Sequence, residues 1–222
     1  MKWQIDRADF FIRERQAIRK TFPDAELVEV EGVVVLRGYF PVHDKEGSEI
    51  DRYKLYIKFP RNYPEKIPVV FIADERIAPV VQRHVFPKSK TACLCLPHEV
   101  PLYLSEVNFS YFWEKLLKFW LVGQAGYDHT GQWPFPERKH DASAIYEGFS
   151  ELLGISDLNA VQRFTVLLLR KNPAKGHELC PCGSGRKLKN CHQEEYNKVR
   201  ELLSSDILKL YRMILKHIPS LF

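Results

Sequence analysis

The cysteines of the chain, five in all, lie in two short segments whose spacing indicates two kinds of chemistry. The first segment, residues 91–97, places Cys93 and Cys95 on either side of a leucine. The second supplies three thiols and an imidazole: Cys180, Cys182, Cys191 and His192. Because no cysteine remains for a disulfide framework, the pattern favours a reducing setting, and we expect a cytoplasmic protein.

Cys95 is the candidate nucleophile. A thiolate attacks an activated carboxyl group, holds the acyl group as a thioester and releases it to a primary amine. Polar Thr91 and the turn-forming residues 97–99 predict an exposed loop, where a thiol is reactive. The alternative is a buried, inert cysteine of the kind common in protein cores. We favour the nucleophile because of its polar surroundings.

Cys93 has several interpretations. In an extended loop its side chain points the same way as that of Cys95, about 6.6 Å away along the chain. It is either a small filler residue or a functional one: an acyl relay, a residue that tunes the Cys95 thiol, or its redox partner. A zinc site combining both thiols with His84 and His98 is disfavoured, because closed tetrahedral coordination would occupy the nucleophile. His98 is a candidate to orient or deprotonate an incoming amine, or it is simply solvated.

The second cysteine segment has the ligand set of a closed tetrahedral site, so we expect one structural Zn²⁺ as the cofactor. Gly183 and Gly185 allow the chain to turn tightly around an ion. Lysines and arginines surround the segment, and we interpret them as a solvated face. A net charge of +5 is mild, so nucleic acid is not expected as a partner.

The elements that must position these residues follow from the periodicity. Residues 9–22 place Phe11, Ile18 and Phe22 on one side of a predicted amphipathic helix. A valine-rich stretch at 27–40, punctuated by Gly32 and Gly38, and segments at 53–59 and 69–72 are predicted to form strands. The loop with the cysteine pair and an aromatic helix at 109–122 follow. Helix, antiparallel meander, loop and helix together predict an α+β fold.

Beyond Gly126 the pattern is helical. We predict helices at 144–153 and 158–170, the second ended by Pro173, and one long amphipathic helix from Tyr196 to Ile214. The expected organisation is a first domain at 1–128, a helical connector at 129–175, the zinc motif at 176–195 and a terminal helix at 196–222. No apolar run is long enough to span a bilayer, and the first residues do not form a signal peptide, so no membrane association is expected.

The prolines at 60, 64 and 68 exclude a helix and predict a stiff, extended segment. This segment reads Phe-Pro-x-x-Tyr-Pro-x-x-x-Pro, and Leu94-Cys95-Leu96 follows about 30 residues later, before the aromatic helix. In this combination residues 1–125 resemble the ubiquitin-conjugating enzymes. The resemblance implies an α+β domain with an N-terminal helix, a four-stranded meander and a catalytic loop.

The resemblance also implies residue roles. Cys95 matches the catalytic cysteine of the ubiquitin-conjugating enzymes, and Leu94 and Leu96 match the apolar residues that anchor its loop. His84 falls where that family has the histidine of a His-Pro-Asn motif, but here the run is His-Val-Phe-Pro. The proline is displaced and the asparagine, which stabilises the loop or the oxyanion in the family, is absent.

Residues 180–192 closely resemble the SEC-C motif, which ends the bacterial protein SecA and occurs in many other bacterial proteins. The motif acts either as a docking module or as a staple for the terminal helix. A conjugating-enzyme domain beside it resembles stand-alone bacterial enzymes of anti-phage operons. Their implied acyl donor is the C-terminal tail of a cyclic-oligonucleotide synthase, a nucleotidyltransferase, and the acceptor is an amine-bearing protein.

Three functions remain open from the sequence. The first is an enzyme, an acyltransferase of the ubiquitin-conjugating type with a thioester on Cys95. The second is a non-catalytic module that binds a ubiquitin-like protein or a nucleotidyltransferase tail. The inactive variants that act in this way lack the cysteine, whereas Cys95 is present here. The third is a redox protein using Cys93 and Cys95.

Overall fold

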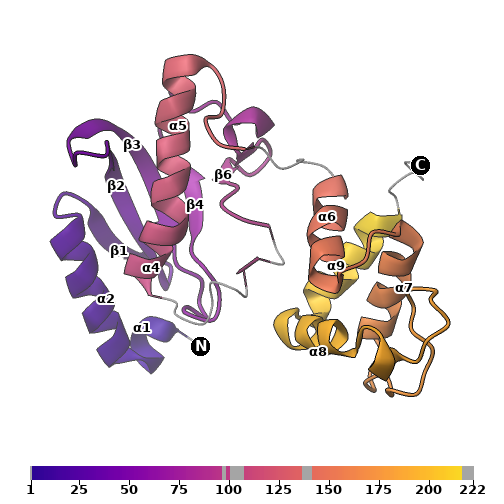
Figure 1. The fold of residues 1–222 in the computed structure, drawn as a ribbon. Coiled ribbons are helices and arrows are strands. Elements are labelled where there is room, and N and C mark those ends of the chain that lie inside the picture. The colour runs from indigo at the N-terminus through magenta and orange to yellow at the C-terminus, as the bar shows by residue number, and fades with distance from the viewer. Residues whose placement is uncertain (1, 97–98, 101–107, 137–141, 217–222) are drawn as a thin grey trace. The chain divides into compact units, whose positions relative to one another are not determined.

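The computed structural model describes residues 2–96, 99–100, 108–136 and 142–216, which fall into two compact units (Figure 1). Residues 1–95 and 103–137 form the N-terminal unit, and residues 96–102 and 138–222 form the C-terminal unit. An antiparallel sheet dominates the first and helices the second, so the chain is α+β, as the sequence predicted.

The N-terminal unit begins with two helices. They are the short α1 (Trp3–Asp6) and α2 (Ala8–Thr21), and α2 agrees within a residue with the predicted helix. Ile18 and Phe22 are buried, with 1% and 4% of their surface exposed, as the amphipathic pattern required. The helix ends at Phe22 because Pro23 restricts the backbone of the residue before it.

The sheet of the N-terminal unit has the strand order β1-β2-β3-β4-β6-β5 within the described residues, and every pairing is antiparallel. Its strands are β1 (Glu26–Val30), β2 (Val33–His43), β3 (Glu49–Lys58), β4 (Val69–Ile72), β5 (Val85–Phe86) and β6 (Thr91–Ala92). The strand predicted at 53–59 is confirmed, and it alternates, because Tyr53, Leu55 and Ile57 are fully buried while Tyr56 and Lys58 between and beyond them are exposed. The short hairpin of β5 and β6 was not predicted, since two-residue strands carry no readable period.

The proline segment between β3 and β4 contains no helix, as predicted, but it turns rather than running extended. Backbone bonds join Tyr63 N–H to the Pro60 carbonyl at 2.9 Å and Glu65 N–H to the Asn62 carbonyl at 2.8 Å. Tyr63 is buried, and its hydroxyl donates to Glu14 Oε2 of α2 at 2.6 Å. The segment is therefore anchored to α2 by its aromatic side chain.

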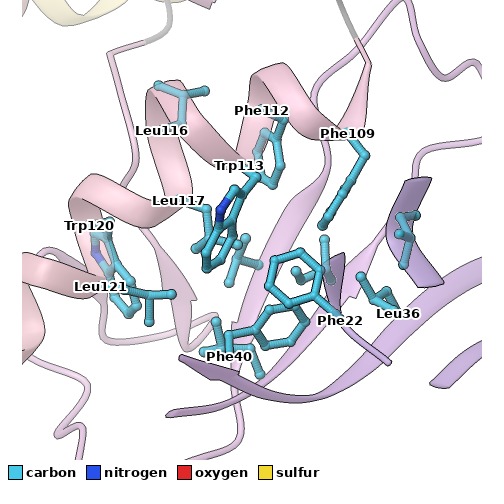
Figure 2. Close-up of a cluster of buried hydrophobic side chains, with 14 of the residues drawn as sticks. Phe22, Leu36, Phe40, Phe109, Phe112, Trp113, Leu116, Leu117, Trp120 and Leu121 are labelled. Carbon is cyan, nitrogen blue, oxygen red and sulfur yellow. The ribbon is translucent and has the colours of Figure 1, made fainter. Parts of the chain in front are cut away.

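Helices after the cysteine loop cover one face of this sheet. They are α4 (Phe109–Phe112), the π-helical η3 (Trp113–Leu117) and α5 (Lys118–Thr130), which follow one another directly. Figure 2 shows their aromatic side chains directed at β2 and at the end of α2. The ring of Phe22 lies 5.2 Å from that of Phe40 and 4.6 Å from that of Trp113. This aromatic core fixes α5 on the sheet.

The C-terminal unit is a group of helices with its own core. Its elements are α6 (Ala142–Leu153), α7 (Leu158–Leu168), the 3₁₀ turn η4 (Leu188–Asn190), α8 (Gln193–Leu202) and α9 (Ser205–Lys216). Phe149, Phe164 and Tyr211 are fully buried in this core. Where one long terminal helix was predicted, the structure has two. Ser204 lies between them and caps α9, its Oγ accepting from Ile207 N–H at 3.4 Å.

Candidate metal centre and cysteine loop

The β5–β6 hairpin places His84 opposite Cys93. Val85 pairs with Ala92 and Phe86 with Thr91, so His84 and Cys93 are the next residues in register. The N–H of Cys93 donates to the His84 carbonyl at 2.8 Å, which extends the hairpin by one bond. The structure therefore brings together two of the predicted site residues through their backbones.

His84 itself is fixed by two aromatic side chains. It has a left-handed backbone with φ of 50°, and its carbonyl also accepts from Trp120 Nε1 at 3.1 Å. Its imidazole lies against the indole of Trp133, with 4.2 Å between the ring centres. The turn that begins the hairpin is thus held on α5 and on the segment that follows α5.

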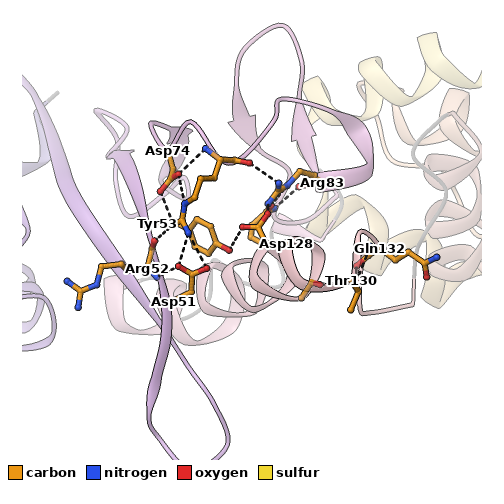
Figure 3. A network of polar contacts seen from close by, with 11 residues as sticks. Asp51, Arg52, Tyr53, Asp74, Arg83, Asp128, Thr130 and Gln132 are labelled. Carbon is orange, nitrogen blue, oxygen red and sulfur yellow. Dashed lines mark hydrogen bonds and ion pairs between the residues drawn. The ribbon is translucent and has the colours of Figure 1, made fainter.

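Arg83, next to His84, connects this turn to α5 through a buried polar network (Figure 3). Its Nε donates to Gln124 Oε1 at 2.9 Å, and Gln124 Nε2 donates back to the Arg83 carbonyl at 2.7 Å. Its guanidinium also donates to Asp128 Oδ1 at 2.5 Å, while the Tyr53 hydroxyl donates to Asp128 Oδ2 at 2.7 Å. Sequence reasoning missed this network because its members are far apart along the chain.

Arg76 extends the network to the end of β4. Its guanidinium bonds Asp74 Oδ1 at 3.1 Å and Asp51 Oδ1 at 3.0 Å, and it lies 4.6 Å from the centre of the Tyr53 ring. Partial burial alone would raise the pKa of Asp74 and of Asp51. Hydrogen bonds from Arg76 and from backbone N–H groups outweigh it and lower both. The carboxylates are therefore ionised partners of Arg76 at neutral pH.

Cys95 lies just beyond β6, half-buried at the edge of the core. Leu94 packs against the same core. Beyond Cys95, Leu96 N–H donates to Glu99 Oε2 at 2.7 Å, and Glu99 N–H donates to the Leu96 carbonyl at 2.9 Å. Two of the three residues of the predicted turn at 97–99 lie outside the described residues, and the bonds of Glu99 were not predicted. His98 lies outside the described residues.

The second cysteine segment forms a compact Cys/His cluster in the C-terminal unit. Its four ligand atoms, from Cys180, Cys182, Cys191 and His192, all lie within 4.8 Å of one another. The Sγ atoms of Cys182 and Cys191 are 3.5 Å apart, and His192 Nδ1 is 3.4 Å from Cys180 Sγ. Zn–S bonds of about 2.3 Å in a tetrahedron place two sulfurs roughly 3.8 Å apart. The cluster is compatible with a zinc ion held through His192 Nδ1.

Local backbone geometry builds the cluster. Cys180 N–H donates to the Arg186 carbonyl at 2.9 Å, closing a loop in which Gly183 and Gly185 have φ of 85° and 71°. Only glycine adopts such values without strain, so their predicted role in a tight turn is confirmed. The loop ends at η4, where Leu188 is fully buried in the core of the C-terminal unit.

The thiols differ in their protonation because their surroundings differ. Burial raises the pKa of the Cys180 thiol to about 12. Burial acts on Cys182 in the same direction but is outweighed by the hydroxyl and N–H of Ser184, which lower its pKa to about 6. Ser184 Oγ lies 3.1 Å from Cys182 Sγ and 3.4 Å from Cys191 Sγ. A hydroxyl group beside two sulfur atoms can donate a hydrogen bond to a thiolate, so it stabilises the ionised form over the thiol.

The comparisons with known proteins agree with this geometry in one region. A model of the SEC-C motif matches residues 178–194, which contain the whole Cys/His cluster. No curated protein and no solved structure matches the chain. The likeness of residues 1–125 to the ubiquitin-conjugating enzymes therefore stays a prediction. In the described part of the chain, no helix combines the length and apolar character needed to cross a membrane.

Proposed function

We propose that the chain is a cysteine acyl carrier of the ubiquitin-conjugating type, with Cys95 as its nucleophile. The observation that carries the proposal is the position of Cys95. It is half-buried where the chain leaves the sheet, directly after a hairpin anchored to α5. A thiol held in a fixed loop at the edge of a core, rather than inside it, suits nucleophilic chemistry.

The reaction needs an activated acyl donor, either an acyl adenylate or a thioester on another protein. The Cys95 thiolate attacks the acyl carbon, a carbon–sulfur bond forms, and the adenylate or the donor thiolate leaves. An amine then attacks the thioester, an amide forms, and Cys95 leaves as a thiolate while the ammonium proton passes to a base. His98, three residues along the chain, is the proposed base, and a residue other than the missing family asparagine must stabilise the oxyanion.

The partners in this proposal follow from the sequence resemblance alone. The acyl donor is a protein with an exposed C-terminal tail, in the first instance a cyclic-oligonucleotide synthase encoded beside it. The acceptor is a protein amine. The biological setting that this implies is bacterial anti-phage defence.

We further propose that the Cys/His cluster holds a structural zinc ion. Three thiolates and an imidazole close the coordination, so the ion would hold the loop together and take no part in acyl transfer. Cys180 and Leu188 belong to the core of the C-terminal unit, and the His192 ring lies 5.9 Å from that of Phe164. These contacts favour a staple for α8 over an independent docking module.

Mass spectrometry of the chain co-expressed with its genomic neighbours tests the acyl carrier. We expect an adduct on Cys95 that thiols remove in the wild type and that resists thiols in Cys95→Ser, because a serine ester exchanges slowly with thiols. Cys93→Ser keeps the adduct and the product if Cys93 tunes or fills the site, and traps the adduct without product if Cys93 relays. An adduct that persists in Cys95→Ala would show that another residue is the nucleophile.

The same samples separate the alternatives. A binding module would retain its partner in Cys95→Ala and form no adduct in the wild type. A redox protein would show a Cys93–Cys95 disulfide after exposure to an oxidant and no acylation. Either result in place of the adduct would overturn the acyl-carrier proposal.

A further inference from the structure

The face of the sheet opposite the helices carries an uncommon set of side chains. Alternation along β2 and β3 buries Leu36, Phe40 and Leu55 beneath the helices and turns the intervening residues outward. Among these, Tyr39 and Tyr56 are large aromatic residues with 53% and 41% of their surface exposed. Exposed tyrosines on a sheet offer flat rings to a ligand.

The strand register groups these rings with cations. Tyr39 pairs with Lys54, and Arg37 pairs with Tyr56. Side chains of directly paired residues share a face at about 5 Å, and those on the diagonal, as for the two tyrosines, at about 7–8 Å. Phe71 of β4 pairs with Tyr56 and continues the aromatic row onto a third strand.

The charge of this face is positive. Its positions on β2 and β3 carry four cations, Arg37, Arg52, Lys54 and Lys58, against one carboxylate, Glu49 at the start of β3. Glu26 of β1 neutralises Arg37 at 2.7 Å, and Glu49 neutralises Arg52 at 2.6 Å. No ion pair is recorded for the two lysines among the described residues, so their charge is available to an anion.

A hollow continues the face at one end. It has a volume of about 410 Å³ and is lined by Val33, Val35 and Lys58, with Arg61 and Glu31 at its sides. Apolar walls with two cations and one carboxylate fit a flat ring system that accepts and donates hydrogen bonds and is attached to a phosphate. The hollow and the tyrosines therefore present surfaces for the same kind of ligand.

We propose that this face binds a single-stranded nucleic acid. Unpaired bases stack on Tyr39 and Tyr56, one base or nucleotide enters the hollow, and Lys54, Lys58 and Arg61 contact the phosphates. A duplex would hide its base faces from the rings. An acidic peptide would satisfy the lysines but make no use of the tyrosines or the hollow.

This surface could not be predicted from the amino-acid sequence. A net charge of +5 is an average over the whole chain, and the most obvious basic cluster surrounds the second cysteine segment. The residues of this face come from three strands and from Arg61, and only the register shows that the strand residues lie together. The surface is independent of Cys95, so its test does not depend on acyl transfer.

Fluorescence anisotropy of the full chain with labelled oligothymidylate and oligouridylate tests the proposal. We expect salt-dependent binding that weakens roughly tenfold in Tyr56→Ala and in Tyr39→Ala, and that Tyr56→Phe retains, because stacking needs the ring and not the hydroxyl. Lys58→Glu weakens binding and lowers its salt dependence. Lys20→Glu, the same charge change on the exposed surface of α2, leaves binding within about twofold of wild type.

Four results would overturn the proposal. The first is no binding of either oligonucleotide at low salt. The second is equal loss in Lys20→Glu and Lys58→Glu, which would mean diffuse electrostatic attraction. The third is equally tight binding of duplex DNA. The fourth is displacement by polyglutamate together with full binding in Tyr39→Ala and Tyr56→Ala, which would mean that the face takes an acidic protein partner instead.

Discussion

At the scale of single residues, one buried side chain can hold several segments of the chain together. Glu14 of α2 is an example, because its Oε2 accepts from the Tyr63 hydroxyl at 2.6 Å and from Phe109 N–H at 2.7 Å. One buried carboxylate therefore joins α2, the proline segment and the start of α4. Burial raises the pKa of Glu14 despite these hydrogen bonds.

The pH dependence of stability tests this role. Because the folded-state pKa of Glu14 lies above its unfolded value, the free energy of unfolding falls as pH rises from the ordinary glutamate range through the raised value. Glu14→Gln keeps a carbonyl acceptor and carries no charge, so we expect this fall to disappear and stability at pH 7 to match or exceed wild type. Urea unfolding of the wild type and of Glu14→Gln across the acidic pH range measures this change in the free energy of unfolding.

Glu14→Ala is the matched control. It leaves the Tyr63 hydroxyl and the Phe109 N–H without their acceptor, which costs about 1–3 kcal/mol at every pH. If Glu14→Gln loses as much stability as Glu14→Ala at pH 7, the charge of the carboxylate stabilises the fold. The free energy of unfolding would then not fall as Glu14 ionises, and the prediction would be wrong.

At the scale of helices and strands, the elements with a clear sequence period could be predicted and the others could not. Helix α2 and strand β3 were predictable because a single period runs through each, with Ile18 or Leu55 on the buried side. The β5–β6 hairpin and the Arg83 network were not, since the hairpin strands are too short to show a period and the network joins residues 41 to 75 positions apart. The break at Ser204 has a local signal, a helix-capping residue within a helical pattern, that the periodicity outweighed.

The two candidate sites also differ in how far the sequence allowed them to be predicted. The cluster at residues 180–192 was predictable in full because its ligands are close together in the sequence and their spacing is set by zinc chemistry. In the cysteine loop, only the nucleophile and its neighbours could be named. The contacts that position Cys93, from His84 and through it from α5, depend on the tertiary structure.

At the level of elements, two glycines allow the segment after α5 to fold back over that helix. A Cβ atom on Gly123 would lie 2.2 Å from the Trp133 ring, and one on Gly126 would lie 2.6 Å from Pro134. We expect Gly123→Ala to displace Trp133 from the His84 ring and to cost about 1–3 kcal/mol. Thermal unfolding and the indole emission spectrum report both effects.

A double-mutant cycle supplies the control. In a Trp133→Ala background the same methyl group has no ring to meet, so Gly123→Ala should be neutral or slightly stabilising there, as alanine favours helix. Equal costs in the two backgrounds would mean that the ring does not occupy the space beside Gly123.

At the scale of the whole molecule, the two units have separate hydrophobic cores, one centred on the sheet and one between the helices α6 to α9. The proposed zinc ion belongs to the second core, in which Cys180 and Leu188 are buried. Removing the ion should therefore affect the two units unequally. Ligands that are scattered in an unfolded segment gain order when the metal arrives, so the binding energy contributes to folding of that segment.

Chelation or Cys182→Ser should unfold residues around 175–195 and leave the sheet of the N-terminal unit protected. Hydrogen exchange followed by mass spectrometry resolves this by peptide: we expect loss of protection in peptides of η4 and α8, and unchanged exchange in β2 and β3. Cys93→Ser controls for the loss of a thiol, since that residue lies outside the cluster and should alter no exchange in η4 or α8. Purified protein without stoichiometric zinc, or full protection of residues 175–195 after chelation, would mean that the cluster folds by its packing alone.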